Sequence, residues 1–176
     1  AYTELPFITA EDHAYAMENI MQRVADAMVE EGVPFTGVLY GGLMKTPQGI
    51  KVIEFNARFG DPETEVVLPR LKSDAVEVFM AVAENKTPDT VWSDEATLGI
   101  VLASKGYPGD YAKGFAIRGT ESVADSKIYH MGTAMKDGEL VTAGGRVMIV
   151  VASAPTLREA QQKAEADVRR IECDNL

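Results

Sequence analysis

The segment KVIEFNARFGDPETE, residues 51–65, begins as an apolar strand and ends in a dense group of polar side chains. Residues two apart in an extended strand point to the same side, about 6.5–7 Å apart along the chain, so Glu54, Asn56 and Arg58 are predicted to share one face. Carboxylate and carboxamide oxygens are the ligands that magnesium prefers, especially when phosphate oxygens complete its shell. An arginine one step further on can hold a phosphate or a developing oxyanion with two parallel hydrogen bonds. This spacing is therefore typical of a site for a metal ion and a phosphate.

The turn after these residues adds backbone access and further carboxylates. Gly60 lets the backbone approach a ligand closely, and the Asp61 carboxylate can bind an ammonium group. Glu63 either contacts a substrate or, as an acid in the first turn of a helix, only stabilises the helix dipole. The simpler interpretation of the E-x-N-x-R alternation is the solvated face of an amphipathic strand. A solvated face needs neither a glycine nor three acids in one turn, so the FGDPETE that follows directly favours a functional site.

A helix and two strands are expected to position this segment. Thr9 begins a capping box, and the apolar stripe with helical spacing that follows it predicts a packed helix. Residues 36–45 and 50–57 are predicted to pair as a hairpin. The two glycines of the first strand, Gly41 and Gly42, predict a bulge or a close backbone approach.

The chain after the turn is predicted to form two short helices. Asp61 and Pro62 are residue types that start a helix, Pro69 interrupts it, and Asp74 caps the next one. Residues 85–92 are the best candidate for a domain boundary.

Four short strands and one helix are predicted for the remainder of the chain. Turns that contain glycine and aspartate separate the strands, which are expected at residues 98–104, 127–133, 139–143 and 146–153. Thr156 and Glu159 form a capping box at the start of the last helix. A stripe spaced to pack on a sheet gives this helix its predicted buried face, Leu157, Ala160, Ala164, Val168 and Ile171.

Composition excludes several classes of protein. The chain has 176 residues, of which 46% are hydrophobic and 25% are charged, the balance of a globular protein. Its net charge of −10 opposes binding to nucleic-acid phosphates, and the longest apolar run, 147–152, is far too short to cross a bilayer. We therefore expect neither nucleic acid nor a membrane as a partner. Cys173 is the only cysteine, so no internal disulfide is expected.

The ends of the chain carry two further expectations. No basic and apolar leader precedes Ala1, so a cytoplasmic setting is expected. The chain begins without methionine and stops just after a predicted helix, which predicts an incomplete chain.

The motif EFNARFGDPETE, with TGVLYGGLM before it and GYPGDY after it, resembles the phosphoribosylamine–glycine ligase family of the ATP-grasp superfamily. The RFGDPE stretch is much more specific to this family than the E-x-N pattern, which the whole superfamily shares. The resemblance runs over essentially the whole chain but covers only the later part of the family's sequence. The family's N-terminal domain and most of its ATP-clamping half have no counterpart here.

The resemblance implies a reaction and a set of site residues. In the family, ATP phosphorylates the carboxylate of glycine, and the amine of 5-phosphoribosylamine attacks the resulting glycyl phosphate. The products are glycinamide ribonucleotide, ADP and phosphate, in de novo purine biosynthesis. Glu54 and Asn56 match the ligands of Mg²⁺ (or Mn²⁺), and Arg58 matches the residue that steadies the phosphoryl group and the oxyanion. Gly60 and Asp61 match the loop that receives glycine.

The resemblance also implies the architecture, an α/β (α+β) fold in two parts. Residues 1–93 would be the C-terminal portion of an ATP-grasp domain, with an antiparallel sheet and packed helices. Residues 94–176 would be a small β-rich domain closed by a helix. The expected partners are glycine, 5-phosphoribosylamine, ATP and the missing N-terminal portion, without which the fragment is expected to be inactive. The alternatives are a non-catalytic nucleotide- or metal-binding module and another ATP-grasp carboxylate ligase of purine synthesis.

Several other residues have chemistry to offer, and each has a plainer interpretation. His130 lies on a predicted strand, where it either contacts phosphoribosylamine or is structural. Arg146, after two glycines, either reaches the ribose phosphate or is a solvated residue of a tight turn. GYPGDY, residues 106–111, is interpreted as a turn. His13 is expected to be exposed, and Cys173 is assigned no function.

Overall fold

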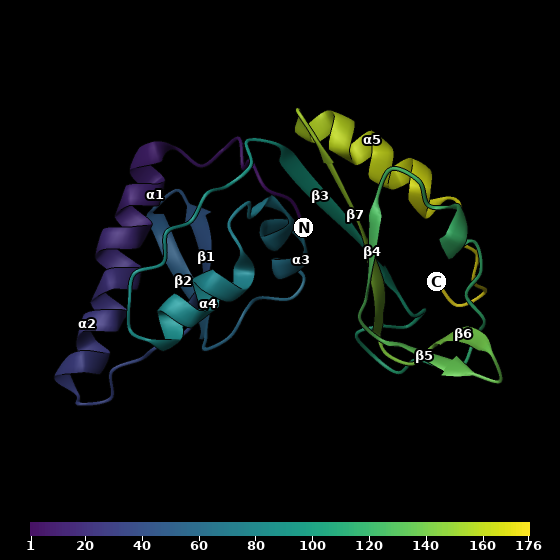
Figure 1. Cartoon of the computed structure of the whole chain (residues 1–176), viewed down its shortest axis with the longest axis horizontal. Helices are drawn as coiled ribbons and strands as arrows, with labels where there is room; N and C mark the ends of the chain where they lie inside the picture. Colours follow the sequence, from purple (N-terminus) through teal and green to yellow (C-terminus); the bar gives the residue numbers. More distant parts are fainter. The chain divides into compact units, whose positions relative to one another are not determined.

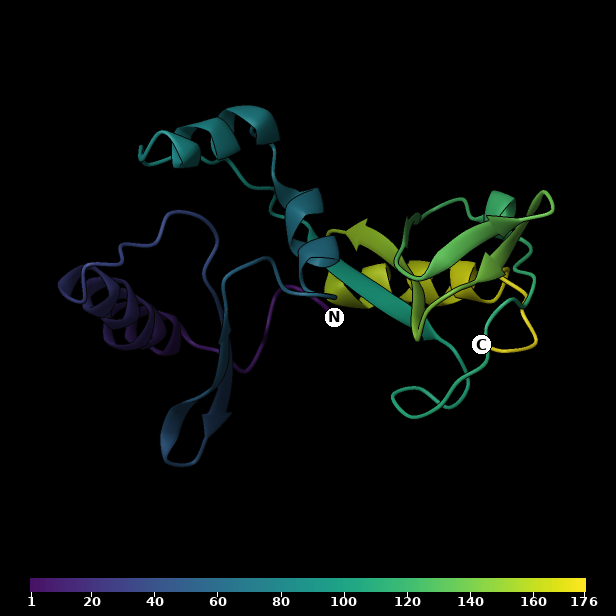
Figure 2. The ribbon, with the colours of Figure 1, turned by 90° about the horizontal axis from the view of Figure 1, so that it is seen from below.

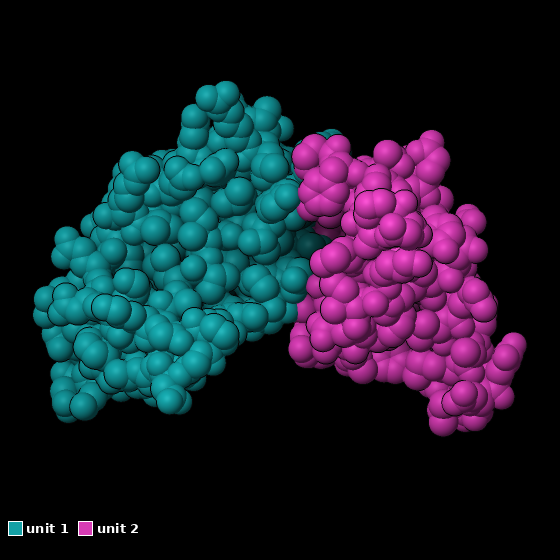
Figure 3. Space-filling model, turned by 180° about the vertical axis from the view of Figure 1, so that it is seen from behind, with its two compact units in different colours: residues 1–4, 61–70, 93–176 teal, residues 5–60, 71–92 magenta.

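The structure, a computed structural model, describes all 176 residues and divides into two compact units. Unit 1, teal in Figure 3, comprises residues 1–4, 61–70 and 93–176. Unit 2, magenta, comprises residues 5–60 and 71–92. Both units contain helices and antiparallel strands, which confirms the mixed α/β prediction.

A long helix begins unit 2 where the capping box predicted it. α1 (Ala10–Ala16) continues through the π-helical turn η1 (Met17–Met21) into α2 (Gln22–Glu30). The Thr9 hydroxyl accepts from the Asp12 amide, and the Asp12 carboxylate accepts from the Thr9 amide, so both donors at the helix start are satisfied. No side chain of these three segments is buried, so the packed core expected beneath the apolar stripe is absent from unit 2.

The predicted hairpin forms the only sheet of unit 2. β1 (Tyr40–Thr46) pairs antiparallel with β2 (Gly49–Asn56), and the register shifts between Gly42 and Leu43, which confirms the expected bulge. The first strand begins at Tyr40, later than predicted. α4 (Ala75–Ala83) is capped as predicted, because the Asp74 carboxylate accepts from the amides of two residues in its first turn.

A three-stranded antiparallel sheet organises unit 1 (Figure 1). Its strands, in spatial order, are β3 (Ala96–Ala103), β7 (Arg146–Ala154) and β4 (Lys127–His130). The strand predicted at 127–133 is two strands, because the chain bends after His130 and then forms a second hairpin from β5 (Thr133–Lys136) and β6 (Glu139–Thr142). The short 3-10 helix η3 (Thr120–Ser122) precedes β4.

The core of the molecule lies around β7, whose residues 147–152 are almost entirely shielded from solvent. On one side Val66, from α3 (Thr64–Val67), packs with Ile149 and Val151. A Cβ at Gly99 of β3 would lie 2.9 Å from Val66, so glycine is required there for α3 to approach the sheet. The 3-10 turn η2 (Leu68–Arg70) ends this segment at the predicted proline.

The helix α5 (Leu157–Val168) packs against β3 and β7 (Figures 1 and 2). Its predicted capping box, Thr156 with Glu159, is confirmed. Ala160 and Ala164 are fully buried as predicted, but the third buried residue of the helix is a charged one, Asp167. None of the helices in the chain combines the length and the apolar character needed to span a bilayer.

Asp167 is buried because its carboxylate holds the loop before β4. It accepts from the amides of Ala124 and Asp125 and from the guanidinium of Arg170, at 3.3, 3.0 and 2.8 Å. Burial acts to raise the pKa of Asp167, but hydrogen bonds to its carboxylate and the Arg170 charge lower it below its usual value. The loop and α5 are therefore joined by an ionised carboxylate inside unit 1.

Candidate functional site

Glu54 and Asn56 lie on one face of β2 in unit 2, as their spacing predicts. The Asn56 carboxamide donates to Glu54 Oε1 over 2.9 Å, so the two side chains are in direct contact. Gly42 lies opposite Glu54 in the hairpin, and a Cβ there would be 3.0 Å from Glu54 Cγ. One of the two β1 glycines therefore makes room for the Glu54 side chain.

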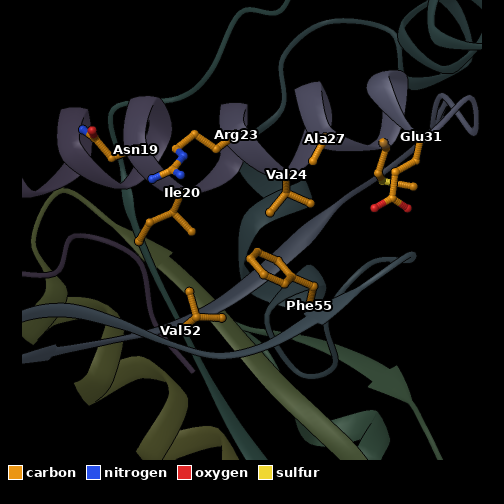
Figure 4. Close-up of a pocket in the computed structure, with 9 residues that line it drawn as sticks. Asn19, Ile20, Arg23, Val24, Ala27, Glu31, Val52 and Phe55 are labelled. Carbon is orange, nitrogen blue, oxygen red and sulfur yellow. The ribbon is translucent and has the colours of Figure 1, made fainter.

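The second β1 glycine makes room for the helix of unit 2. A Cβ at Gly41 would lie 2.7 Å from Met21 Sδ. Next to this contact, an open groove of about 430 Å³ runs between the helix and β2. Figure 4 shows apolar side chains facing it from both sides, Ile20 and Val24 from the helix and Phe55 from β2. The apolar residues of the hairpin on this side are only partly covered, since Val52 is 45% exposed and Phe55 is 37% exposed.

Arg58 lies beyond the end of β2, in a bend of the chain. Its guanidinium donates to the carbonyl oxygen of Phe59 at 2.7 Å, and the side chain is exposed. The structure therefore brings Glu54 and Asn56 together, and it places Arg58 two residues past the strand end with its guanidinium turned to the local backbone. Gly60, the last residue of this segment of unit 2, is buried.

Asp61 and Glu63 belong to unit 1, in a turn that precedes α3. The prediction that Asp61 and Pro62 start a helix is wrong, since α3 begins at Thr64 and its N-cap residue is Glu63, whose side chain makes no capping bond. Asp61 does not cap the helix because its carboxylate has another partner. Arg146 Nη1 donates to Asp61 Oδ1 at 2.9 Å and to the Asp61 carbonyl oxygen at 2.7 Å.

Sequence reasoning left two alternatives for Arg146, a contact to the ribose phosphate or a solvated position in a turn, and did not foresee its contact with Asp61. Burial acts to lower the pKa of its guanidinium, but the hydrogen bond and the charge of Asp61 raise it above its usual value. The local signal was the Gly144-Gly145-Arg146 sequence. The partner of Arg146 could not be predicted from this local sequence, because 85 positions separate Arg146 from Asp61.

Glu65 and Tyr129 influence each other electrostatically, which sequence reasoning missed. Glu65 Oε2 is buried without a hydrogen-bond partner. Burial, and then the charge of Glu65, raise the pKa of Tyr129. Both residues belong to unit 1, where Tyr129 packs against the cluster that contains Val66.

The remaining candidates have local explanations. His130 Nδ1 lies 3.0 Å from Thr133 Oγ1, and the ring is exposed. His13 is exposed, as predicted. Cys173 is a free cysteine that packs against the core of unit 1. Nowhere do three or more His, Cys, Asp or Glu side chains converge as a set of metal ligands. A metal ion at Glu54 and Asn56 would thus need most of its ligands from substrate or water, as is usual for magnesium.

Comparison with known proteins gives two family matches, one at each end of the chain. Residues 1–64 match the ATP-grasp (A) domain of phosphoribosylglycinamide synthetase, and residues 97–176 match its C domain. A phosphoribosylamine–glycine ligase of Halalkalibacterium halodurans is 48% identical over 177 residues, which cover 100% of this chain and 41% of the relative. The trifunctional purine biosynthetic protein adenosine-3 of Gallus gallus is 45% identical over 97% of this chain and 18% of its own length.

A solved structure gives the same result. The crystal structure of phosphoribosylamine–glycine ligase from Thermotoga maritima superposes with a TM-score of 0.84 at 29% identity, over 97% of this chain and 43% of that one. The chain thus spans about two fifths of the length of such relatives. It belongs to the phosphoribosylamine–glycine ligase family of ATP-grasp proteins, of which it represents the C-terminal portion.

Proposed function

We propose that this chain is the C-terminal portion of an ATP-dependent ligase that joins glycine to 5-phosphoribosylamine. The observation that carries the proposal is the 48% identity to a ligase of that name along the whole chain. Within the chain, the ATP-grasp portion would extend to residue 93, and residues 94–176 would form the C-terminal domain. This boundary is a prediction from the sequence.

The proposed reaction has two steps, a phosphoryl transfer followed by an acyl transfer. A carboxylate oxygen of glycine attacks the γ-phosphorus of ATP, and the bond from that phosphorus to the bridging oxygen breaks to release ADP. The amine nitrogen of phosphoribosylamine then attacks the carbonyl carbon of glycyl phosphate. The bond from this carbon to the phosphate oxygen breaks, so phosphate leaves and the nitrogen loses a proton. No side chain needs to act as a covalent nucleophile.

Glu54 and Asn56 are the residues that would hold a divalent metal ion. They offer a carboxylate and a carboxamide whose side chains are already in contact, 2.9 Å apart, and such oxygen donors suit magnesium or manganese. When bound, the ion screens the charge of the ATP phosphates during transfer. Asn56 would have to turn its carboxamide oxygen toward the ion, because its nitrogen faces Glu54 in the structure.

Arg58, Gly60 and Asp61 would serve the two substrates of the first step. The Arg58 guanidinium is exposed and held only by a backbone carbonyl, so it can turn to stabilise the phosphoryl group and the acyl-phosphate oxyanion. Gly60 allows close approach of the backbone to glycine, and the Asp61 carboxylate binds the glycine ammonium group. Glu63 has two equally supported interpretations: it contacts a substrate, or it only stabilises the dipole of α3.

The first experiment is to measure ADP release with glycine and freshly generated phosphoribosylamine. It compares this chain with the completed ligase, defined as this chain joined to the N-terminal part that its relatives carry. We expect turnover only in the completed ligase and only with both substrates, because the chain alone lacks most of the ATP clamp. Absence of turnover in a completed ligase that folds would contradict the proposal.

A non-catalytic module is the second candidate function. It is favoured by the small share of each relative that the chain covers, 41% for the Halalkalibacterium halodurans ligase. Such a module would bind magnesium and ATP without glycine-dependent turnover, and the same assay distinguishes the two. Replacing glycine by bicarbonate or formate in the assay tests the remaining alternative, another ATP-grasp ligase of purine synthesis.

A further inference from the structure

The guanidinium of Arg146 holds Asp61 at two points. One nitrogen, Nη1, donates to the Asp61 carbonyl oxygen at 2.7 Å and to Asp61 Oδ1 at 2.9 Å. Both residues belong to unit 1, so this contact lies within one compact body. Neither bond uses Oδ2, the second carboxylate oxygen. The contact therefore orients the carboxylate while it keeps the adjoining backbone in place.

The backbone just before β7 is held in place by hydrogen bonds and close packing, which fixes the position from which the Arg146 side chain extends. The buried residue Ser104 donates its amide to the Gly145 carbonyl at 2.7 Å and its hydroxyl to the Gly144 carbonyl at 2.8 Å. A Cβ at Gly144 would lie 2.9 Å from the backbone of Gly132. These contacts fix the backbone immediately before Arg146.

An aromatic ring fixes the other end of the side chain. The Arg146 guanidinium carbon lies 5.9 Å from the centre of the Tyr107 ring, and the Tyr107 ring packs edge-on against Tyr111. A Cβ at Gly145 would collide with Tyr107, so a glycine is needed for the ring to reach this position. The GYPGDY turn thus does more than reverse the chain, because it supplies the surface on which Arg146 rests.

We infer that Arg146 is a positioning residue that orients Asp61 toward the ammonium group of an amino-acid substrate. This inference rests on the proposed ligase function. The two bonds set the direction of the carboxylate, and they leave Oδ2 for an ammonium donor. Preorganising a side chain in this way lowers the cost of binding the substrate, so the effect should fall on glycine affinity.

The test is steady-state kinetics of the completed ligase with Arg146→Met. We expect the KM for glycine to rise about tenfold or more, with a smaller change in kcat and no change in the KM for phosphoribosylamine. Arg146→Lys keeps the positive charge and one donating nitrogen but loses the planar guanidinium, so it should restore part of the glycine affinity. The matched control is Arg118→Met, since Arg118 is an arginine of the same unit with 73% of its side chain exposed.

A double-mutant cycle shows whether Arg146 acts through Asp61. If it does, Asp61→Asn combined with Arg146→Met raises the glycine KM no more than Asp61→Asn alone. Independent, multiplying effects would overturn the inference, as would a rise in the phosphoribosylamine KM in place of the glycine KM. The latter would make Arg146 a direct contact of the ribose phosphate.

Two outcomes separate this inference from the proposal beneath it. A wild-type completed ligase without glycine-dependent turnover refutes the proposed function. Normal wild-type turnover with Arg146→Met no different from Arg118→Met refutes the inference alone. If Arg146→Met fails to fold, Arg146→Lys decides, because unchanged glycine KM in that folded variant also contradicts a role for the planar guanidinium.

Discussion

At the scale of single residues, the hairpin of unit 2 presents Glu54 and Asn56 as a preformed pair of oxygen-bearing side chains. The pair depends on the bulge and on Gly42, which removes the side chain that would lie against Glu54. Glu54 is exposed, so neither its burial nor a core contact explains its position. The Glu54 carboxylate is therefore accessible to a ligand.

Glu54→Ala in the completed ligase should reduce kcat by about 100-fold or more while folding is retained. A metal ligand contributes several kcal/mol of charge stabilisation in phosphoryl transfer, whereas replacing an exposed side chain usually changes stability by less than about 0.5 kcal/mol. The measurement is ADP release at saturating magnesium, with thermal unfolding as the check on folding.

Lys51→Ala is the matched control for Glu54→Ala, because Lys51 is another exposed, charged residue of the same strand. It should leave turnover unchanged. Turnover retained in Glu54→Ala would remove the assignment of Glu54 as a metal ligand.

At the scale of elements, α5 is secured by side chains at both ends. The Thr156–Glu159 capping box satisfies its first amides, and Asp167 in its last turn binds the loop that leads into β4. A buried carboxylate of this kind stabilises only while it is ionised and fully paired. The attachment of α5 to the loop should therefore depend on pH.

Asp167→Asn should lower the free energy of unfolding of unit 1 by about 2 kcal/mol near pH 7, since hydrogen bonds to a charged group are lost. The folded pKa of Asp167 lies below its unfolded value, which is about 3.9. Its stabilisation is therefore complete above that pH and disappears as the pH falls through the folded pKa. Urea unfolding followed by the NMR amide signals of β7, at neutral and acid pH, measures the difference.

The difference between wild type and Asp167→Asn should be largest at neutral pH and should shrink below about pH 4. Glu172→Gln provides the control, because Glu172 follows α5 with an exposed side chain. An equal loss of stability at neutral and acid pH would contradict the role of the ionised carboxylate.

At the scale of the whole molecule, the two units differ in how much apolar surface they bury. Every fully buried apolar side chain belongs to unit 1. Unit 2 has a two-stranded sheet whose apolar residues stay open, with Ile53 63% exposed and Met44 54% exposed. A lone hairpin is marginally stable in water, so unit 2 is expected to need further chain to cover it.

Hydrogen exchange on the isolated chain should divide along the two units. Amides of β3 and β7 should exchange slowly, because opening them exposes the core of unit 1, whereas those of β1 and β2 should exchange nearly as fast as unfolded chain. In the completed ligase the β1 and β2 amides should become protected by at least about 100-fold, a change of about 2.7 kcal/mol in opening free energy.

Each unit serves as the internal control for the other in this exchange experiment. Equal protection of β1 and β7 in the isolated chain would contradict the expected difference in stability. Unchanged exchange of β1 and β2 in the completed ligase would show that the N-terminal part does not cover unit 2.

The sequence by itself determined the local structure and the chemical types at the candidate site. The caps at Thr9, Asp74 and Thr156 and the hairpin with its E-x-N face depend on residues only a few positions apart, so propensity and periodicity were sufficient. Helix α3 shows the limit, because Asp61 has the right type for a cap but pairs with a distant arginine instead.

The tertiary structure alone decided the partners of charged groups and the location of the core. The contact between Asp61 and Arg146, the burial of Asp167 and the open apolar surface of unit 2 all depend on which elements pack together. A local pattern records which face of an element is apolar, but not which distant element meets it. The packing of distant elements against one another determines which charges pair and which side chains are buried, so these features could be read only from the folded chain.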